Sequence, residues 1–263
     1  WWGDESGPYN AKTNPNGFGD TVSDNIIFSP WRKTDPFKAK TPVIIIPGIM
    51  GTEMFNGSEK LWLDLMHNLT DIGDQFMDVL QFKSDLTPLV DGLIVGDVIR
   101  KKTVAVFTFD YSDGLINEFK NQGYTENTDL FVFPYDWRYG VDGINIEKLK
   151  QKISDILIQT GKEKVDIIAH STGGLLVKKY VIDYPTENHI NKTVFVGVPN
   201  TGAPQAIKTF LEGNNFGNPF LANSEIKKIA VNLPIVYDLS PSQQYFNVKG
   251  SFIEIIDDFI LHS

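Results

Sequence analysis

Short apolar runs alternate with amphipathic stretches from about residue 41 onward. Runs rich in β-branched and aromatic residues predict strands at 43–46, 103–108, 130–133, 165–169 and 193–198. Between the third and fourth runs, apolar residues from Ile146 to Leu157 recur with a helical period, and Gly161 closes the predicted helix. Strands that alternate with helices form a mainly parallel sheet covered by helices, so the predicted fold class is α/β.

Two long insertions, at about 57–100 and 205–246, interrupt this alternation. Each follows a predicted strand and is rich in bulky apolar residues, so both are expected to form a cap over a site at the carboxyl edge of the sheet. Residues 1–40 are instead rich in Gly, Pro, Asn, Asp and Ser. The sequence therefore predicts a linker or the tail of an upstream repeat domain at 1–40, and one α/β domain at 41–263.

The composition of the chain excludes several classes of function and of binding site. The 263 residues carry a net charge of −9 and their 24 Lys and Arg residues are scattered, which argues against a nucleic-acid partner. The chain has no cysteine, which excludes disulfides, thiolate metal sites and a cysteine nucleophile. No apolar stretch reaches the roughly 18 to 20 residues of a membrane-spanning helix.

The segment "VDIIAHSTGGLL" at 165–176 places a serine between a predicted strand and an apolar helix. The nucleophile-elbow pattern G-x-S-x-G needs small residues two before and two after the serine, because the turn is very tight. Here these residues are Ala169 and Gly173, and Gly174 leaves further room for the helix. Ser171 is therefore a candidate nucleophile, and the alternative is a serine that caps the helix.

Ester chemistry at a serine also needs N–H groups for the oxyanion, usually from the residue after the serine and from a loop after an early strand. Thr172 supplies the first N–H group. In "PVIIIPGIMGTEMF", Gly48 follows the strand at 43–46 and allows a backbone bend that presents the N–H of Ile49. Ile49 and Thr172 are thus the candidate oxyanion hole.

Five motifs and one insertion carry a family resemblance. They are "PGIMGT" at 47–52, "FPYDWR" at 133–138, "AHSTGG" at 169–174, "GVPNTGAP" at 197–204, "NLPIVYDLSPSQQYF" at 232–246 and the "LWLDLMHNLTDI" segment. With the five motifs in this order and the segment at 61–72 as a first cap segment, residues 41–250 resemble the lecithin:cholesterol acyltransferase and lysosomal phospholipase family of α/β-hydrolases.

The resemblance implies an α/β-hydrolase core with Ser171 as nucleophile and a carboxylic ester of a lipid as substrate. It implies that Asp136 and Arg138 form an internal ion pair rather than catalysing, and no metal or organic cofactor is needed. The residues expected to line a cap for an acyl chain, or simply to form core contacts, are Leu61, Trp62, Leu65, Met66, Phe210, Leu211, Phe216 and Phe220.

The histidine base is harder to place among the four histidines. His170 adjoins the serine and cannot easily turn onto its hydroxyl, His67 lies in the first insertion, and His189 precedes the strand at 193–198. Asp238 and His262 follow Ser171 in the chain order of an α/β-hydrolase triad. However, the segment around Asp238 resembles the end of a cap, so the acid and histidine are expected beyond a chain that stops one or two strands short.

Residues 1–31 resemble the closing segment of right-handed parallel β-helix domains in bacterial surface and secreted proteins. This resemblance implies an exported bacterial protein with an upstream repeat domain. The favoured function is a serine esterase or acyltransferase acting on lipid esters, in transient contact with a lipid surface. The rival is a catalytically silent scaffold in a surface or adhesion protein.

Overall fold

The computed structural model describes residues 40–249, except 63, 65–74, 105–106 and 216–221. The chain divides into two units, residues 1–39 and 40–263. The predicted β-helix tail lies outside the described residues, as do His67 and His262. Those predictions stay predictions.

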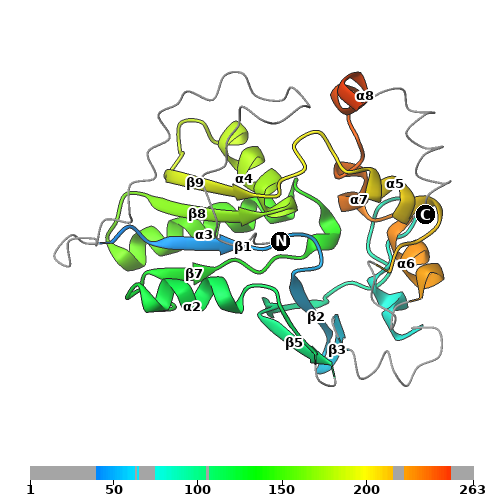
Figure 1. Cartoon of the computed structure of the whole chain (residues 1–263), viewed down its shortest axis with the longest axis horizontal. Coiled ribbons are helices and arrows are strands. Elements are labelled where there is room, and N and C mark those ends of the chain that lie inside the picture. Colours follow the sequence, from blue (N-terminus) through cyan, green and yellow to red (C-terminus); the bar gives the residue numbers. More distant parts are fainter. Residues whose placement is uncertain (1–39, 63, 65–74, 105–106, 216–221, 250–263) are drawn as a thin grey trace, which may run out of the picture. The chain divides into compact units, whose positions relative to one another are not determined.

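The centre of the second unit is a four-stranded parallel sheet with the strand order β7-β1-β8-β9 (Figure 1). Its strands are β1 (Val43–Ile46), β7 (Leu130–Val132), β8 (Val165–His170) and β9 (Ile190–Val196). Four of the five predicted strands are confirmed within a few residues, because each is a short run of mainly apolar residues, β-branched or aromatic, that pairs within this sheet.

Helices cover both faces of this sheet. Alternate side chains of β8 divide the apolar core: Val165 and Ile167 pack with α3 (Ile144–Thr160) and α4 (Thr172–Asp183). Ile168 points to the other face, where Ile116 of α2 (Asp113–Asn121) is buried. The α/β prediction is confirmed, because the period of two along a strand sends neighbouring apolar residues to two helical layers.

The predicted strand at 103–108 is wrong. The structure has two antiparallel strands there, β5 (Lys101–Val104) and β6 (Phe107–Asp110), which form a separate two-stranded sheet. A continuous apolar run fits one buried strand or two strands of a hairpin equally well. Between Thr103 and Thr108 the sequence has no Gly, Pro, Asn or Asp to mark the turn.

The first insertion forms part of a small antiparallel sheet that the sequence did not predict. Its order is β3-β2-β4, with β2 (Thr52–Asn56), β3 (Glu59–Trp62) and β4 (Ile94–Val98). The 3₁₀ helix η2 (Gln75–Leu80) lies between β3 and β4 in the chain. Its strand β2 directly follows β1 and the turn after it, so the sheet is placed to support that turn.

The described part of the second insertion, together with the residues just after it, contains four short helices. They are α5 (Pro204–Leu211), α6 (Asn223–Ala230), α7 (Pro234–Asp238) and α8 (Gln243–Lys249). In Figure 1 the parallel strands point toward the side of the molecule where α5, α6 and α7 lie. These helices are therefore at the carboxyl edge of the sheet, where α/β folds place their sites.

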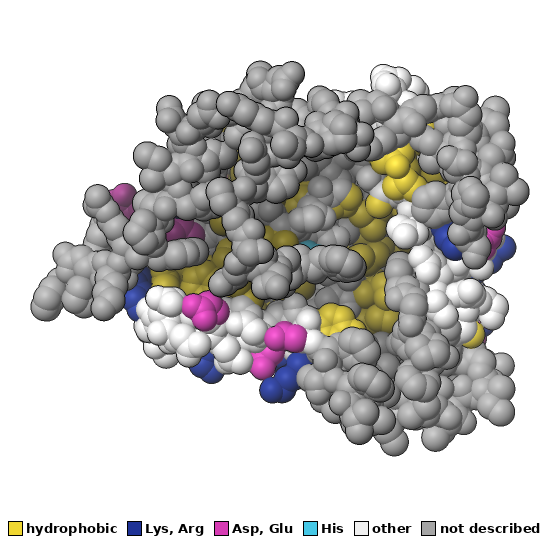
Figure 2. Space-filling view, in the orientation of Figure 1, with side chains coloured by type: hydrophobic (Ala, Val, Ile, Leu, Met, Phe, Trp, Pro, Cys, Tyr) yellow, Lys and Arg dark blue, Asp and Glu magenta, His cyan; other side chains and the backbone are white. Residues whose placement is uncertain are grey.

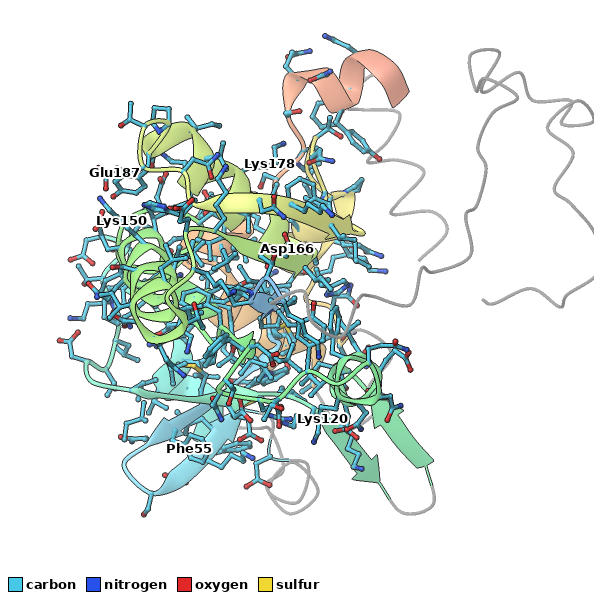
Figure 3. The ribbon with its side chains drawn as sticks, turned by 90° about the vertical axis from the view of Figure 1, so that its left-hand side faces the viewer. Phe55, Lys120, Lys150, Asp166, Lys178 and Glu187 are labelled. Atoms are coloured by element: carbon cyan, nitrogen blue, oxygen red, sulfur yellow. The ribbon has the colours of Figure 1, made fainter. Side chains whose placement is uncertain are left out.

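The outer surface is charged and holds solvent-exposed ion pairs. Lys150 of α3 pairs with Glu187 at 3.0 Å, and both lie on the flank shown in Figure 3. None of the described helices is long and apolar enough to cross a membrane.

Candidate active site

Ser171 lies at the junction of β8 and α4 with a backbone φ of +51°. A non-glycine residue in this region is uncommon and strained. The bend is held by backbone bonds from Ser171 N–H to Val196 O (2.9 Å) and from Gly174 N–H to Ser171 O (3.0 Å). The Ser171 side chain makes no capping hydrogen bond, so the interpretation as a helix cap is wrong.

Small residues allow this bend, as the motif predicts. Ala169 is fully buried. A Cβ atom on Gly173 would lie 2.5 Å from the Pro47 carbonyl oxygen, and one on Gly174 would lie 2.2 Å from Val198. A Cβ atom on Gly48 would lie 2.8 Å from the Ser171 Cβ atom. The bend at Ser171 and the turn after β1 therefore pack directly on each other, and a side chain at Gly48 or Gly173 would force them apart.

The turn after β1 runs from Pro47 to Gly51, and we call it the β1 turn. It is closed by a hydrogen bond from the Gly51 N–H to the Gly48 carbonyl at 3.1 Å, and Met50 has φ +62°. Because C=O and N–H point in opposite directions in a trans peptide, this bond turns the N–H of Ile49 away from the turn. Within the described part of the chain, neither the Ile49 N–H nor the Thr172 N–H has a hydrogen-bond acceptor.

Two side chains from distant segments hold the β1 turn. The Trp62 Nε1–H donates to the Met50 carbonyl at 2.7 Å, and the Tyr135 hydroxyl donates to the Pro47 carbonyl at 3.2 Å. The Tyr135 and Thr172 hydroxyls also lie 2.8 Å apart. Sequence reasoning missed both contacts, although the aromatic donors in "KLWL" and "PYDWR" were the available signal.

The "PYDWR" motif packs against the β1 turn and the start of β2. Asp136 accepts from the Arg138 Nε–H (2.9 Å) and Nη2–H (2.7 Å), and both side chains are buried. The predicted internal ion pair is confirmed. Trp137 donates through Nε1–H to the Thr52 carbonyl at 3.3 Å, so the motif also reaches the start of β2.

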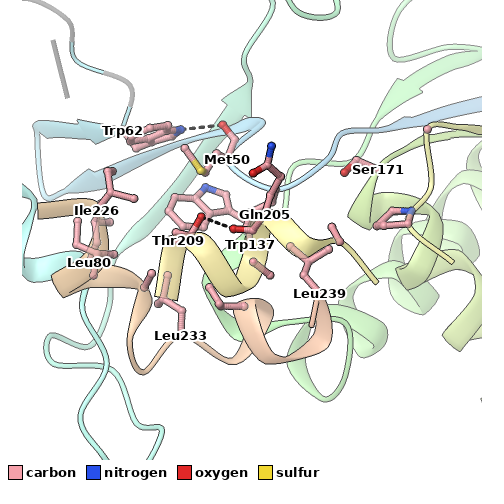
Figure 4. A pocket seen from close by; sticks show the side chains of 18 residues that line it. Met50, Trp62, Leu80, Trp137, Ser171, Gln205, Thr209, Ile226, Leu233 and Leu239 are labelled. Atoms are coloured by element: carbon pink, nitrogen blue, oxygen red, sulfur yellow. Dashed lines mark hydrogen bonds between the residues drawn. The ribbon is translucent and has the colours of Figure 1, made fainter. Parts of the chain in front are cut away.

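A cavity of about 270 Å³ extends from Ser171 (Figure 4). Ser171 lies at one end, and Trp62, Leu80 and Ile226 lie at the other. The lining is almost wholly apolar. It consists of Ile49, Met50, Trp62, Leu80, Trp137, Ser171, Gly197, Pro199, Ala203, Gln205, Ala206, Thr209, Ile226, Ile229, Ala230, Leu233, Val236 and Leu239.

The residues that the sequence predicts to line the cap lie partly in the cavity wall, partly in the core and partly at the surface. Trp62 lines the cavity, Leu61 is buried in the core, Phe210 packs against the core and Leu211 is exposed. The other four candidates lie outside the described residues: Leu65, Met66, Phe216 and Phe220. The sequence thus identified one residue of the cavity lining, Trp62, and missed the small and branched residues that α5, α6 and α7 contribute.

A second cavity, of about 480 Å³, shares Ile49, Met50 and Trp62 with the first. Its lining includes His170 and Val196 at the carboxyl ends of β8 and β9. Figure 2 shows hydrophobic side chains gathered across the middle of the face where the sheet lies. The β1 turn therefore has an apolar space on each side, and only the first cavity includes Ser171 in its lining.

Among the described residues, no hydrogen bond joins a histidine or a carboxylate to the Ser171 hydroxyl. Desolvation lowers the pKa of His170, although its side chain is exposed at the surface. His189 precedes β9 and lies at the amino end of the sheet, as expected. The Asp238 carboxylate accepts from the Val141 N–H at 2.9 Å, and His262 lies outside the described residues. The site thus combines a strained serine with two available amides, and its proton acceptor stays unassigned.

Comparison with protein families decides what the chain is related to. The model of the lecithin:cholesterol acyltransferase family matches residues 90–258, which is more than half of the chain. The chain belongs to this family. The predicted resemblance to this family is confirmed, and the parallel sheet covered by helices confirms the predicted α/β-hydrolase fold class.

The chain is similar to two curated relatives and, more weakly, to one solved structure. The Arabidopsis thaliana lecithin-cholesterol acyltransferase-like 4 protein is 25% identical over 226 residues, which are 75% of this chain and 42% of that protein. The Arabidopsis thaliana phospholipase A(1) LCAT3 is 29% identical over 133 residues, or 47% and 30%. The Bacillus licheniformis lipase BlEst2 in mature form matches with a TM-score of 0.40 and 16% identity, over 83% and 60%. The chain therefore spans less than half the length of these two relatives.

Proposed function

We propose that this chain belongs to a serine-dependent lipid ester hydrolase or acyltransferase, with Ser171 as the nucleophile. The backbone N–H groups of Ile49 and Thr172 form its oxyanion hole. One observation carries the proposal: a serine with φ +51° lies at the end of an apolar cavity, beside a second turn whose Ile49 N–H has no acceptor among the described residues. A serine that only capped α4 would need neither the strain nor the second turn.

The chemistry follows from this arrangement. The Ser171 Oγ atom forms a bond to the ester carbonyl carbon, and a pair of electrons moves onto the carbonyl oxygen. The two N–H groups bind that oxyanion, and each such donor typically accounts for about 100- to 1000-fold in turnover. A general base takes the serine proton and returns it to the leaving alkoxide as the C–O bond breaks, and an acyl group remains on Ser171. Water or an alcohol then removes the acyl group by the same steps.

Two findings support a lipid ester as the substrate. The cavity beside Ser171 has an almost wholly apolar lining, which suits an acyl chain. The two curated relatives are named as an acyltransferase-like protein and a phospholipase A(1). We also propose an extracellular location and a transient contact with a lipid surface, in line with this substrate.

Labelling with an alkyl fluorophosphonate tests the proposal, because this reagent reacts with activated serines. In the longest natural form of the protein, we expect the label on the peptide that contains Ser171, and Ser171→Ala to abolish it. Ser112→Ala is the matched control, since Ser112 lines the second cavity and donates its hydroxyl hydrogen to the Ile99 carbonyl. Labelling should persist in this variant. A protein that is not labelled at Ser171 would favour the silent scaffold.

A further inference from the structure

We infer that Tyr135 is a positioning residue that couples the two halves of the oxyanion hole. It lies after β7, far along the chain from both turns, yet its fully buried hydroxyl touches the β1 turn through Pro47 and the start of α4 through Thr172. The inference deepens the proposed function and rests on it. It concerns the placement of the Ile49 and Thr172 N–H groups, not contact with the substrate.

The direction of the hydrogen bonds can be assigned from the atoms involved. A carbonyl oxygen only accepts, so the single Tyr135 hydroxyl hydrogen goes to the Pro47 carbonyl. The Tyr135 oxygen must then accept from the Thr172 hydroxyl at 2.8 Å. The result is a directed chain from the Thr172 O–H through the Tyr135 O–H to the Pro47 carbonyl. Burial raises the pKa of Tyr135, so the phenol keeps the proton that this chain requires.

The chain fixes one peptide plane on each side of the site. Binding of the Pro47 carbonyl sets the peptide just before the Gly48–Ile49 peptide, whose N–H belongs to the proposed hole. Binding of the Thr172 hydroxyl ties the first residue of α4 to the same tyrosine. Because the Thr172 hydroxyl hydrogen is already donated to Tyr135, this side chain orients the site and does not itself donate to the oxyanion.

Tyr135→Phe keeps the ring and removes both hydrogen bonds. In the longest natural form of the protein, we expect kcat for a p-nitrophenyl ester to fall by about 10- to 100-fold, because displacement of a catalytic group by a fraction of an ångström has costs of this order. KM should change by less than about threefold, because the hydroxyl touches no substrate. Tyr180→Phe is the matched control: Tyr180 is equally buried and donates to the Glu187 carbonyl at 3.0 Å, away from both turns. Its kcat should match that of the parent.

Thr172 variants test the same chain from its other end. Thr172→Val removes the hydroxyl at similar volume, and we expect a loss of kcat similar to that of Tyr135→Phe. Thr172→Ser restores the hydroxyl and should recover most of that loss. The double variant Tyr135→Phe, Thr172→Val should lose little more than either single variant, since both break one chain.

These outcomes distinguish the positioning role of Tyr135 from the proposed serine mechanism at Ser171. If Ser171→Ala abolishes turnover while Tyr135→Phe and Thr172→Val keep the parent kcat, the coupling by Tyr135 is wrong and the serine mechanism stands. If Ser171→Ala keeps full turnover, the proposed function is wrong and the inference falls with it. If Tyr135→Phe does not fold, the difference in kcat between Thr172→Val and Thr172→Ser decides the question.

Discussion

The turn at Ser171 and the β1 turn both border the cavity with a residue in the left-handed region, but they are held in different ways. The turn at Ser171 is held by backbone groups, through its place between β8 and α4 and through two hydrogen bonds, one within the turn and one to Val196 of the neighbouring strand β9; the small residues Ala169 and Gly173 leave room for it. The β1 turn has one internal hydrogen bond, and its other support comes from Trp62 and Tyr135.

This difference separates the site into a rigid half and an adjustable half. The backbone of Ser171 cannot rearrange without breaking the β8–α4 junction. The β1 turn can lose one side-chain donor and still keep its internal bond. We therefore expect substitutions in the turn at Ser171 to abolish activity. Substitutions of Trp62 and Tyr135, which donate hydrogen bonds to the β1 turn, should reduce activity by smaller factors.

The largest expected effect is at Gly173, where the two turns touch. In Gly173→Ala the new Cβ atom would meet the Pro47 carbonyl oxygen at 2.5 Å and Ile46 Cγ2 at 2.9 Å. Alanine raises helix propensity by about 1 kcal/mol, but overpacking against backbone costs about 1–3 kcal/mol, so the net effect is a modest loss of stability. Turnover should fall by more than about 100-fold, because the turns are forced apart. Thermal unfolding and kcat/KM measure the two effects separately.

Gly92→Ala provides the control for this substitution. Gly92 has φ +78° and no atom within 4 Å of the position that a Cβ atom would take, so alanine there is strained but meets no neighbour. It should cost about 1 kcal/mol of stability and leave turnover unchanged. Equal turnover in Gly173→Ala and Gly92→Ala would mean that contact between the turns does not matter.

A smaller effect is expected at Trp62. Trp62 and Trp137 both line the cavity and pack edge to face at 5.9 Å, and each donates its indole N–H to a backbone carbonyl. The carbonyl bound by Trp62 is that of Met50 in the β1 turn, whereas Trp137 binds Thr52 beyond it. Trp62→Phe should therefore lower kcat about 10-fold, and Trp137→Phe by less than about threefold.

The two tryptophan variants remove similar area from one cavity wall, so KM for a long-chain ester should rise to a similar extent in both. The comparison of kcat with KM thus distinguishes support of the turn from contact with the acyl chain. An equal fall of kcat in both variants would contradict the separate function of Trp62.

The sequence predicted the turn at Ser171 much better than the support of the β1 turn. Ala169, Ser171 and Gly173 lie within five residues, and their spacing already implies the bend. The hydrogen-bond donors Trp62 and Tyr135 are 12 and 88 residues away in sequence from the carbonyl groups that accept from them. No local sequence pattern predicts such pairings.

The same reasoning explains the outcome for the fold. The strands at 43–46, 130–133, 165–169 and 193–198 could be predicted because a mainly parallel sheet leaves a clear apolar run in each strand. The hairpin at 101–110 was missed because its turn has no residue that favours a turn. The small sheet around β2 was missed because its partners come from an insertion whose pairing is set by tertiary contacts.

The smallest effect on turnover is expected at Asp238, which tests whether this residue belongs to the catalytic site. Its carboxylate binds the Val141 N–H and so joins α7 to the loop after "PYDWR". A triad acid replaced by its amide typically loses about 10⁴-fold in kcat. We expect Asp238→Asn to lose less than about threefold, because the asparagine oxygen can still accept from Val141. A loss near 10⁴-fold would instead support the pair of Asp238 and His262.

The pH dependence of stability provides a second test at this residue. Desolvation and, to a lesser extent, the nearby Asp142 raise the pKa of Asp238, although the Val141 N–H opposes this shift. A carboxyl with a raised folded-state pKa stabilises the protein fully below its unfolded pKa of 3.8, and this contribution is lost as the pH rises through the folded-state pKa. Asp238→Asn cannot ionise, so its melting temperature should exceed that of the parent by more at pH 7 than at pH 4. The difference should be small, because the carboxylate is partly exposed to solvent.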